Sequence, residues 1–126
     1  MDTITTDNAL KPAGHYSQAI VHNDMIYTSG QLAFDAETGE KRKATIEEET
    51  LQVLTNLELV LKEAGSSKEN VLKTTIYISD IALWDQVNRV YAEFFGDHKP
   101  ARSVVPTHGE LHFGFHVELE AVAARG

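Results

Sequence analysis

Residues 45–65 read TIEEETLQVLTNLELVLKEAG, a stretch with the pattern of a long amphipathic helix. Thr45 and Glu48 form a capping box, in which the threonine is the N-cap and the glutamate reaches back to it. The apolar side chains that recur at helical spacing are Ile46, Val53, Leu54, Leu57, Val60, Leu61 and Ala64. Gly65 then supplies the stop signal. The stretch therefore predicts one helix with a continuous apolar face.

Strand signals and a second helix surround this element. Asp80 is predicted to cap the second helix, which Gly96 ends before Pro100; its apolar stripe is Trp84, Val87, Tyr91 and Phe94. The predicted strands are Tyr16–His22 and Met25–Gln31, which form a hairpin, then Val71–Ile78, Arg102–Val105 and His116–Ala123. The order β-β-α-β-α-β-β predicts an α+β fold with both helices on one face of a single sheet.

Two helices cover only one face of such a sheet. The opposite face must then be either a polar surface or a contact with a partner. Ile20, Tyr27, Val105 and Val122 suggest that this face is not fully polar. Self-association and an uncovered face remain open alternatives from this pattern.

Composition limits the classes of function. With 126 residues the chain is expected to form one domain, residues 1–126. It has no cysteine, no apolar run of membrane length and no basic-then-apolar N-terminal signal, so we expect a cytoplasmic protein without a membrane segment. The net charge is −8 and the one cationic run, Lys41-Arg42-Lys43, is followed by Glu47-Glu48-Glu49, which argues against a nucleic-acid partner.

Four segments, in this order, carry a family resemblance: Gly14-His15-Tyr16-Ser17-Gln18-Ala19, Thr28-Ser29-Gly30-Gln31, Pro100-Ala101-Arg102-Ser103 and Val117-Glu118-Leu119-Glu120-Ala121. Together they resemble the RidA (YjgF-type) family of reactive-intermediate deaminases, also known as the endoribonuclease L-PSP family. The resemblance extends from about Asp7 to Ala123. It implies a chorismate mutase-like βαβ fold, with one mixed sheet, and a homotrimer whose sheets pack inward and whose pockets lie between subunits.

The resemblance also implies a reaction and a set of site residues. The expected reaction is hydrolysis of 2-imino acids and their enamine tautomers, such as 2-iminopropanoate and 2-iminobutanoate, to 2-keto acids and ammonia without a cofactor. The expected catalytic residues are Arg102, which would hold the substrate carboxylate, and Glu118, which would orient water and shuttle protons. The expected substrate-binding residues are Tyr16, Ser29, Gly30 and Val104, the last through its backbone.

Other readings of these residues stay open. Glu120 shares a strand face with Glu118, and it is either part of the site, solvent-exposed or in an inter-subunit ion pair. The whole chain could instead be a non-catalytic trimer that binds a small carboxylate, or, against its charge, an endoribonuclease.

The chain departs from the family pattern at three places. His15 stands where the family usually has proline, and Val104 stands where it often has cysteine. The loop Pro106–Gly114 reads one residue longer and contains His108 and His112, which together with His15 are candidates for lining a pocket. A zinc site on His112, His116 and Glu118 is not expected, because four residues of extended chain span roughly 13 Å.

Overall fold

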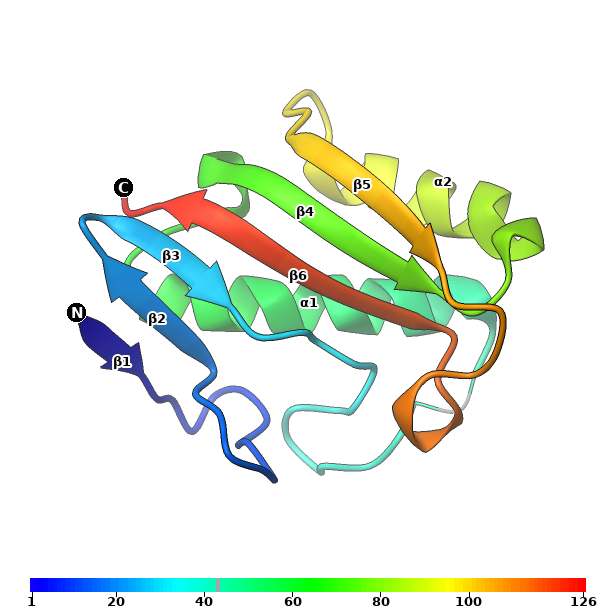
Figure 1. Ribbon diagram of the computed structural model, residues 1–126, viewed down its shortest axis with the longest axis horizontal. Helices are drawn as coiled ribbons and strands as arrows, with labels where there is room; N and C mark the ends of the chain where they lie inside the picture. Colours follow the sequence, from blue (N-terminus) through cyan, green and yellow to red (C-terminus); the bar gives the residue numbers. More distant parts are fainter. Residues whose placement is uncertain (43) are drawn as a thin grey trace.

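The computed structural model describes residues 1–42 and 44–126; Lys43, the last residue of the cationic run, lies outside the described residues. The strands are β1 (Asp2–Ile4), β2 (Ala19–His22), β3 (Met25–Thr28), β4 (Val71–Ile78), β5 (Ala101–Pro106) and β6 (Val117–Ala124). The α-helices are α1 (Ile46–Glu63) and α2 (Trp84–Phe95), and short 3₁₀ turns are η1 (Lys68–Asn70), η2 (Ile81–Leu83) and η3 (His112–Gly114). Figure 1 shows the sheet with both helices behind it.

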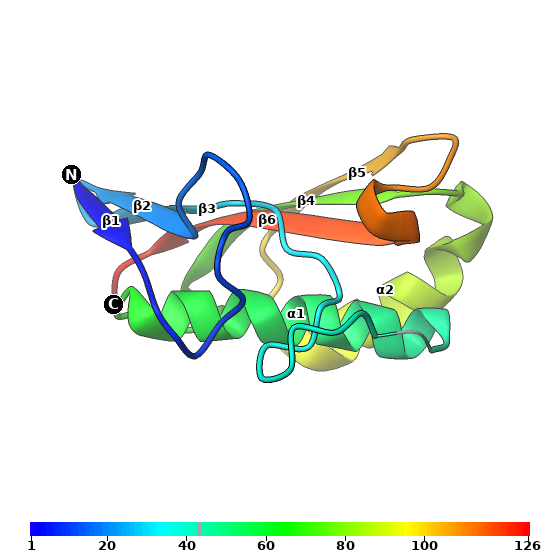
Figure 2. The same cartoon turned by 90° about the horizontal axis from the view of Figure 1, so that it is seen from below.

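The six strands form one sheet in the order β1-β2-β3-β6-β4-β5. β4 and β5 are parallel and are joined through α2, whereas the other neighbouring pairs are antiparallel. Both helices cover the same face of this sheet, as the view in Figure 2 makes plain. The prediction of an α+β fold with one mixed sheet and two helices on one face is confirmed.

The N-terminal strands differ from the prediction. β1 was not expected, so three strands and not two precede α1, and the hairpin strands are shorter than Tyr16–His22 and Met25–Gln31. The first begins late because Tyr16 N–H bonds back to Gly14 O in a turn, 3.1 Å away. The second ends at Thr28, where its pairing with β2 stops, and its pairing with β6 resumes only at an isolated bridge between Gln31 and Leu119. Residues 29–31 therefore lack the continuous pairing of a strand, although their sequence predicts one.

The helix starts follow their predicted caps with two changes. Thr45 Oγ1 accepts from Glu48 N at 3.2 Å, but the Glu48 carboxylate accepts from the Thr45 hydroxyl and not from its backbone. Asp80 caps the turn η2, through Ala82 N, and α2 begins only at Trp84.

The predicted apolar face of α1 forms the centre of the core, where Val53, Leu54, Leu57 and Leu61 are fully buried. Among the described residues, the helices are too short or too polar to cross a bilayer.

Candidate functional site

Glu118 lies on the face of the sheet that the helices leave open. Along β6 the odd-numbered side chains Val117 and Leu119 are buried against the helices, whereas Glu118 and Glu120 point to the opposite side and are half-buried. Glu118 pairs in register with Tyr77 of β4. The prediction that the two glutamates share one face is therefore confirmed.

The carboxylate of Glu118 rests directly on Gly30. A Cβ atom at residue 30 would lie 2.9 Å from Glu118 Cδ and closer still to Oε2, so no larger residue fits while the carboxylate keeps this position. The backbone of Gln31 exchanges two hydrogen bonds with Leu119, N–H to O at 2.8 and 3.2 Å. Asn56 of α1 fixes the following segment, because its amide donates to Leu32 O and Phe34 O at 2.9 and 2.7 Å.

Burial and two charged neighbours shift the pKa of Glu118. Burial raises the pKa of Glu118 most, and the negative charge of Glu120 raises it further, while His112 lowers it. Glu120 in turn accepts a hydrogen bond from the Tyr77 hydroxyl, 2.7 Å from Oη to Oε1. His112 belongs to η3, in the long loop before β6. This surface of β4 and β6 is thus an acidic pair with one histidine nearby.

The structure also shows what holds the start of β6 in place. Glu49 of α1 is only 6% exposed, and its Oε2 accepts from His116 N at 2.8 Å and Val117 N at 2.7 Å. Desolvation raises the pKa of Glu49, and these two N–H groups oppose that rise. The sequence pattern gave no sign of this role, because Glu49 stands in the acidic run Glu47-Glu48-Glu49. Glu49 therefore ties α1 to the strand that carries Glu118.

We expect Glu49→Ala to lower the free energy of unfolding by about 2–4 kcal/mol, because two buried N–H groups lose their acceptor. Glu49→Gln, which keeps a carbonyl acceptor, is expected to lose less. Glu63→Ala on the same helix is the control, since Glu63 is exposed and its loss should change stability by no more than about 0.5 kcal/mol. Urea unfolding followed by circular dichroism measures all three; equal stabilities of the two alanine variants would refute the anchoring role.

Ser29 and Tyr16 lie at the end of the hairpin next to Gly30. The Ser29 hydroxyl donates to Ser17 O, so its hydrogen is used to tie the two segments together. Gln31 Nε2 donates to Ser29 O at 3.1 Å. The Tyr16 ring is 55% exposed and packs near Gly14. Of the predicted binding residues, Gly30 therefore lies against Glu118 and Ser29 precedes it in the chain, while Tyr16 is exposed.

Arg102 occupies a different place, on the helix side of β5. It pairs in register with Thr74, whose side chain is buried toward α2. Its guanidinium lies 4.8 Å from the Trp84 ring centroid and 4.9 Å from that of Tyr91, and its Nη1 donates to Asn88 Oδ1 at 2.8 Å. Trp84, Asn88 and Tyr91 lie on one face of α2, at helical spacing. They hold the guanidinium in one orientation while leaving it exposed.

The predicted catalytic pair is not brought together within one chain. β4 separates β5 from β6, and Arg102 and Glu118 lie on opposite faces of the sheet. Val104 shares the side of Arg102 and packs on the core, and β5 is an edge strand of the sheet. The sequence indicated Arg102 and Glu118, but it did not indicate that α2 holds the Arg102 guanidinium. Trp84 and Tyr91 were predicted to belong to the apolar stripe of that helix, and no motif pointed to Asn88.

The histidines do not form one cluster in the described part of the chain. The His116 ring forms a hydrogen bond with Ser79, with Nδ1 and Oγ 2.8 Å apart. Within residues 1–42 and 44–126, groups of three or more potential metal ligands do not converge.

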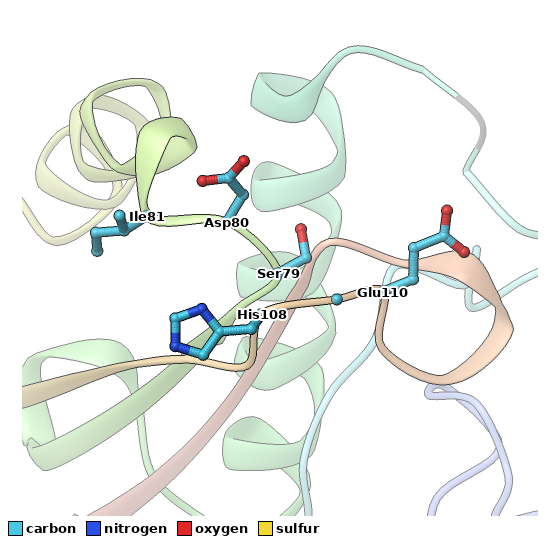
Figure 3. A pocket seen from close by; sticks show the side chains of 6 residues that line it. Ser79, Asp80, Ile81, His108 and Glu110 are labelled. Carbon is cyan, nitrogen blue, oxygen red and sulfur yellow. The ribbon is translucent and has the colours of Figure 1, made fainter.

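A depression of about 440 Å³ is lined by Ser79, Asp80, Ile81, His108, Gly109 and Glu110. In Figure 3 Asp80, His108 and Glu110 point in different directions, so their side chains do not form one binding set.

Comparison with known proteins gives a consistent family. Residues 6–125 match the family model described as Endoribonuclease L-PSP. A RutC family protein of Pyrococcus abyssi is 42% identical over 122 residues, which are 97% of this chain and 95% of that protein. The human protein named 2-iminobutanoate/2-iminopropanoate deaminase is 37% identical over 123 residues, which are 98% of this chain and 89% of that one.

Solved structures with the same fold cover the whole chain. A Thermotoga maritima protein, described as a candidate endoribonuclease, is 41% identical with a TM-score of 0.95, and the match covers 100% of this chain and 98% of that one. The Escherichia coli protein TdcF, solved with bound serine, is 31% identical with a TM-score of 0.93, and the match covers 100% of both chains. Both agree in the arrangement of the sheet and helices over the full length.

Proposed function

The chain belongs to the endoribonuclease L-PSP family, to which the RidA and RutC proteins also belong, and we propose from this membership that it is a hydrolytic deaminase of 2-imino acids. Its products are a 2-keto acid and ammonia, and the reaction uses no cofactor. The observation that carries the proposal is the pre-oriented guanidinium of Arg102, held between Trp84 and Tyr91. The human relative named as an imino-acid deaminase supports the choice of reaction.

Arg102 binds the carboxylate of the substrate in this proposal. A guanidinium presents two parallel N–H donors to a carboxylate and stays charged at every relevant pH. The stack on α2 and the hydrogen bond to Asn88 reduce the entropy that Arg102 loses when the substrate binds. The imine carbon, one bond from the carboxylate, then has a defined position.

Glu118 acts on the water. In the ionised form it accepts a proton from water as the oxygen adds to the imine carbon, and it returns this proton to the nitrogen, which gives the neutral carbinolamine. The same carboxylate then takes the proton of the new hydroxyl group and gives it to the amine nitrogen, so that the C=O bond forms as the C–N bond breaks, ammonia leaves and Glu118 is ionised again. The position of the carboxylate over Gly30 keeps it in one place during these transfers.

A complete site with both Arg102 and Glu118 requires a second copy of the chain. Since Arg102 and Glu118 lie on opposite faces within one chain, we propose that each site takes Arg102 from one subunit and Glu118 from the next. Ile20, Tyr27 and Val122 form an apolar row across the open face, because they are neighbours in register. Tyr27 is 48% exposed in the isolated chain. A homotrimer with the sheets packed inward covers this row.

The direct test is hydrolysis of 2-iminopropanoate and 2-iminobutanoate, generated in place by an amino-acid oxidase. Semicarbazide traps the imine that survives, and its adduct is followed by absorbance. We expect the protein to reduce adduct formation, and heat-denatured protein to have no effect. Adduct formation at the uncatalysed rate with folded protein would refute the proposal.

Glu118→Gln is expected to lower kcat by roughly 10²- to 10⁴-fold, because the amide cannot accept the proton. Since burial and Glu120 raise the pKa of Glu118, we also expect the activity of the unmodified protein to fall as the pH drops through a range above that of an ordinary exposed glutamate. The measurement is kcat/KM against pH, corrected for uncatalysed hydrolysis. Full activity of the glutamine variant would exclude Glu118 as the base.

A second candidate function is binding of a small carboxylate without catalysis. It is favoured by the relative TdcF, whose structure contains serine, a ligand with a carboxylate and an amino group. This function uses Arg102 in the same way but gives affinity without turnover. Calorimetric titration with serine and with 2-ketobutyrate, beside the imine assay, separates the two. Nuclease activity is disfavoured by the net charge of −8.

A further inference from the structure

Tyr77 is a polar residue of the open face that the proposed reaction leaves without a role. It lies on β4, with its Cα opposite that of Glu118 on β6, while Thr75 lies opposite Glu120. Its hydroxyl does not contact the opposite residue but reaches the diagonal one and donates to Glu120 Oε1 at 2.7 Å. Diagonal neighbours on adjacent strands are within reach of a long aromatic side chain.

This hydrogen bond determines where the charge of Glu120 lies. A glutamate has several rotatable bonds, and a half-buried carboxylate without a donor gains hydration by turning toward water. The phenol supplies a donor within the sheet, so the carboxylate stays over β4 and β6. The bond raises the pKa of the Tyr77 hydroxyl, and the charges of Glu120 and Glu118 raise it further. Tyr77 therefore remains a protonated donor at neutral pH.

We propose that Tyr77 is a positioning residue of the site, which acts on Glu118 by fixing the carboxylate of Glu120 beside it. The inference rests on the proposed role of Glu118 and adds a residue that the four family segments do not include. Three groups face the Glu118 carboxylate: Glu120 on the same strand, Tyr77 from β4 and His112 from the loop before β6. Gly30 closes the remaining side with its backbone.

The expected effect follows from the distance between two negative charges. While Tyr77 holds Glu120 in place, the second charge disfavours ionisation of Glu118 and raises its pKa. When the hydroxyl is removed, the Glu120 carboxylate is free to rotate away from Glu118, and the repulsion between the two charges weakens with distance. The pKa of Glu118 then falls, as it does when the charge of Glu120 is removed altogether.

The decisive experiment is an NMR titration of the Glu118 side-chain carboxyl carbon in the full-length protein, in its native assembly. Four forms are compared: unmodified protein, Tyr77→Phe, Glu120→Gln and the double variant. We expect Glu120→Gln to lower the titration midpoint by roughly half a unit to one unit, and Tyr77→Phe to lower it by about half as much. The double variant should match Glu120→Gln alone, because Tyr77 acts only through Glu120.

Tyr27→Phe is the matched control. It removes a tyrosine hydroxyl from the same open face, on β3, and in the described part of the chain this hydroxyl makes no hydrogen bond. We expect it to leave the midpoint of Glu118 unchanged. The inference is overturned if Tyr77→Phe also leaves the midpoint unchanged, or if its shift adds fully to that of Glu120→Gln. Thermal unfolding shows that each variant is folded during the titration.

The titration does not depend on turnover, so it separates this inference from the proposed function. A shifted midpoint without imine hydrolysis supports the role of Tyr77 in positioning Glu120 and refutes the deaminase. Hydrolysis with an unshifted midpoint supports the deaminase and refutes the role of Tyr77. If both hold, the acidic limb of kcat/KM moves to lower pH in Tyr77→Phe by the same amount as the midpoint.

Discussion

Arg102→Ala is expected to abolish measurable imine hydrolysis, with kcat/KM lower by roughly 10²- to 10⁴-fold. The variant loses both charge-assisted hydrogen bonds to the substrate carboxylate, and with them the position of the imine carbon. Arg102→Lys keeps the charge but not the parallel pair of donors, so it should recover only part of the loss. The semicarbazide assay measures the three proteins side by side.

The fold should survive this change. The guanidinium is exposed and its packing is limited to the faces of Trp84 and Tyr91, so Arg102→Ala should lower the free energy of unfolding by only about 1 kcal/mol. Asn88→Ala tests the cradle alone: it removes the hydrogen bond at 2.8 Å but leaves the charge, and we expect a smaller loss, mainly in KM. An Arg102→Ala protein that is folded and fully active would refute the proposed function.

Mixing two inactive variants tests the shared site. If Arg102 and Glu118 come from different subunits, assemblies that contain both Arg102→Ala and Glu118→Gln chains form some sites with both native residues. We expect activity to return after the two variants are unfolded and refolded together, and not when each is refolded alone. If mixed assemblies form, as native mass spectrometry can show, and stay inactive, the two residues do not meet across a subunit contact.

Gly30→Ala is expected to have the second large effect. The added Cβ would occupy the place of the Glu118 carboxylate, which must then leave its position above the backbone. We expect kcat to fall by roughly 10²-fold or more, because a shift of about 1 Å in a reacting group is costly. The fold should be preserved, since residue 30 is exposed and only the far end of one side chain is displaced.

Gly109→Ala provides the control for this variant. Apart from the two chain neighbours of Gly109, no atom of the described residues lies within 4 Å of a Cβ added there, so the same substitution meets open space. We expect its activity and stability to equal those of the unmodified protein. A Gly30→Ala protein with normal kcat would mean that the close approach of Glu118 to residue 30 has no bearing on catalysis.

Local chemistry explains why much of the fold was predictable. The capping threonine, the apolar period of residues 46–64 and the glycine that follows act within a few turns, so they define α1 without tertiary information. The alternation of β6 likewise predicts that Glu118 and Glu120 share a face. β1 was missed because three residues at the chain start form a strand only when β2 lies beside them.

The sequence alone determined the fold class, the family and the residues Arg102, Gly30 and Glu118 as candidates, because each depends on local pattern or on segments in a fixed order. Only the tertiary structure decided which of them meet. Strand order and register put Arg102 over α2, and Glu118 over Gly30 on the opposite face. They also brought Tyr77 to Glu120 across 43 residues of chain. Such pairings depend on how distant strands align, which no stretch of sequence encodes by itself.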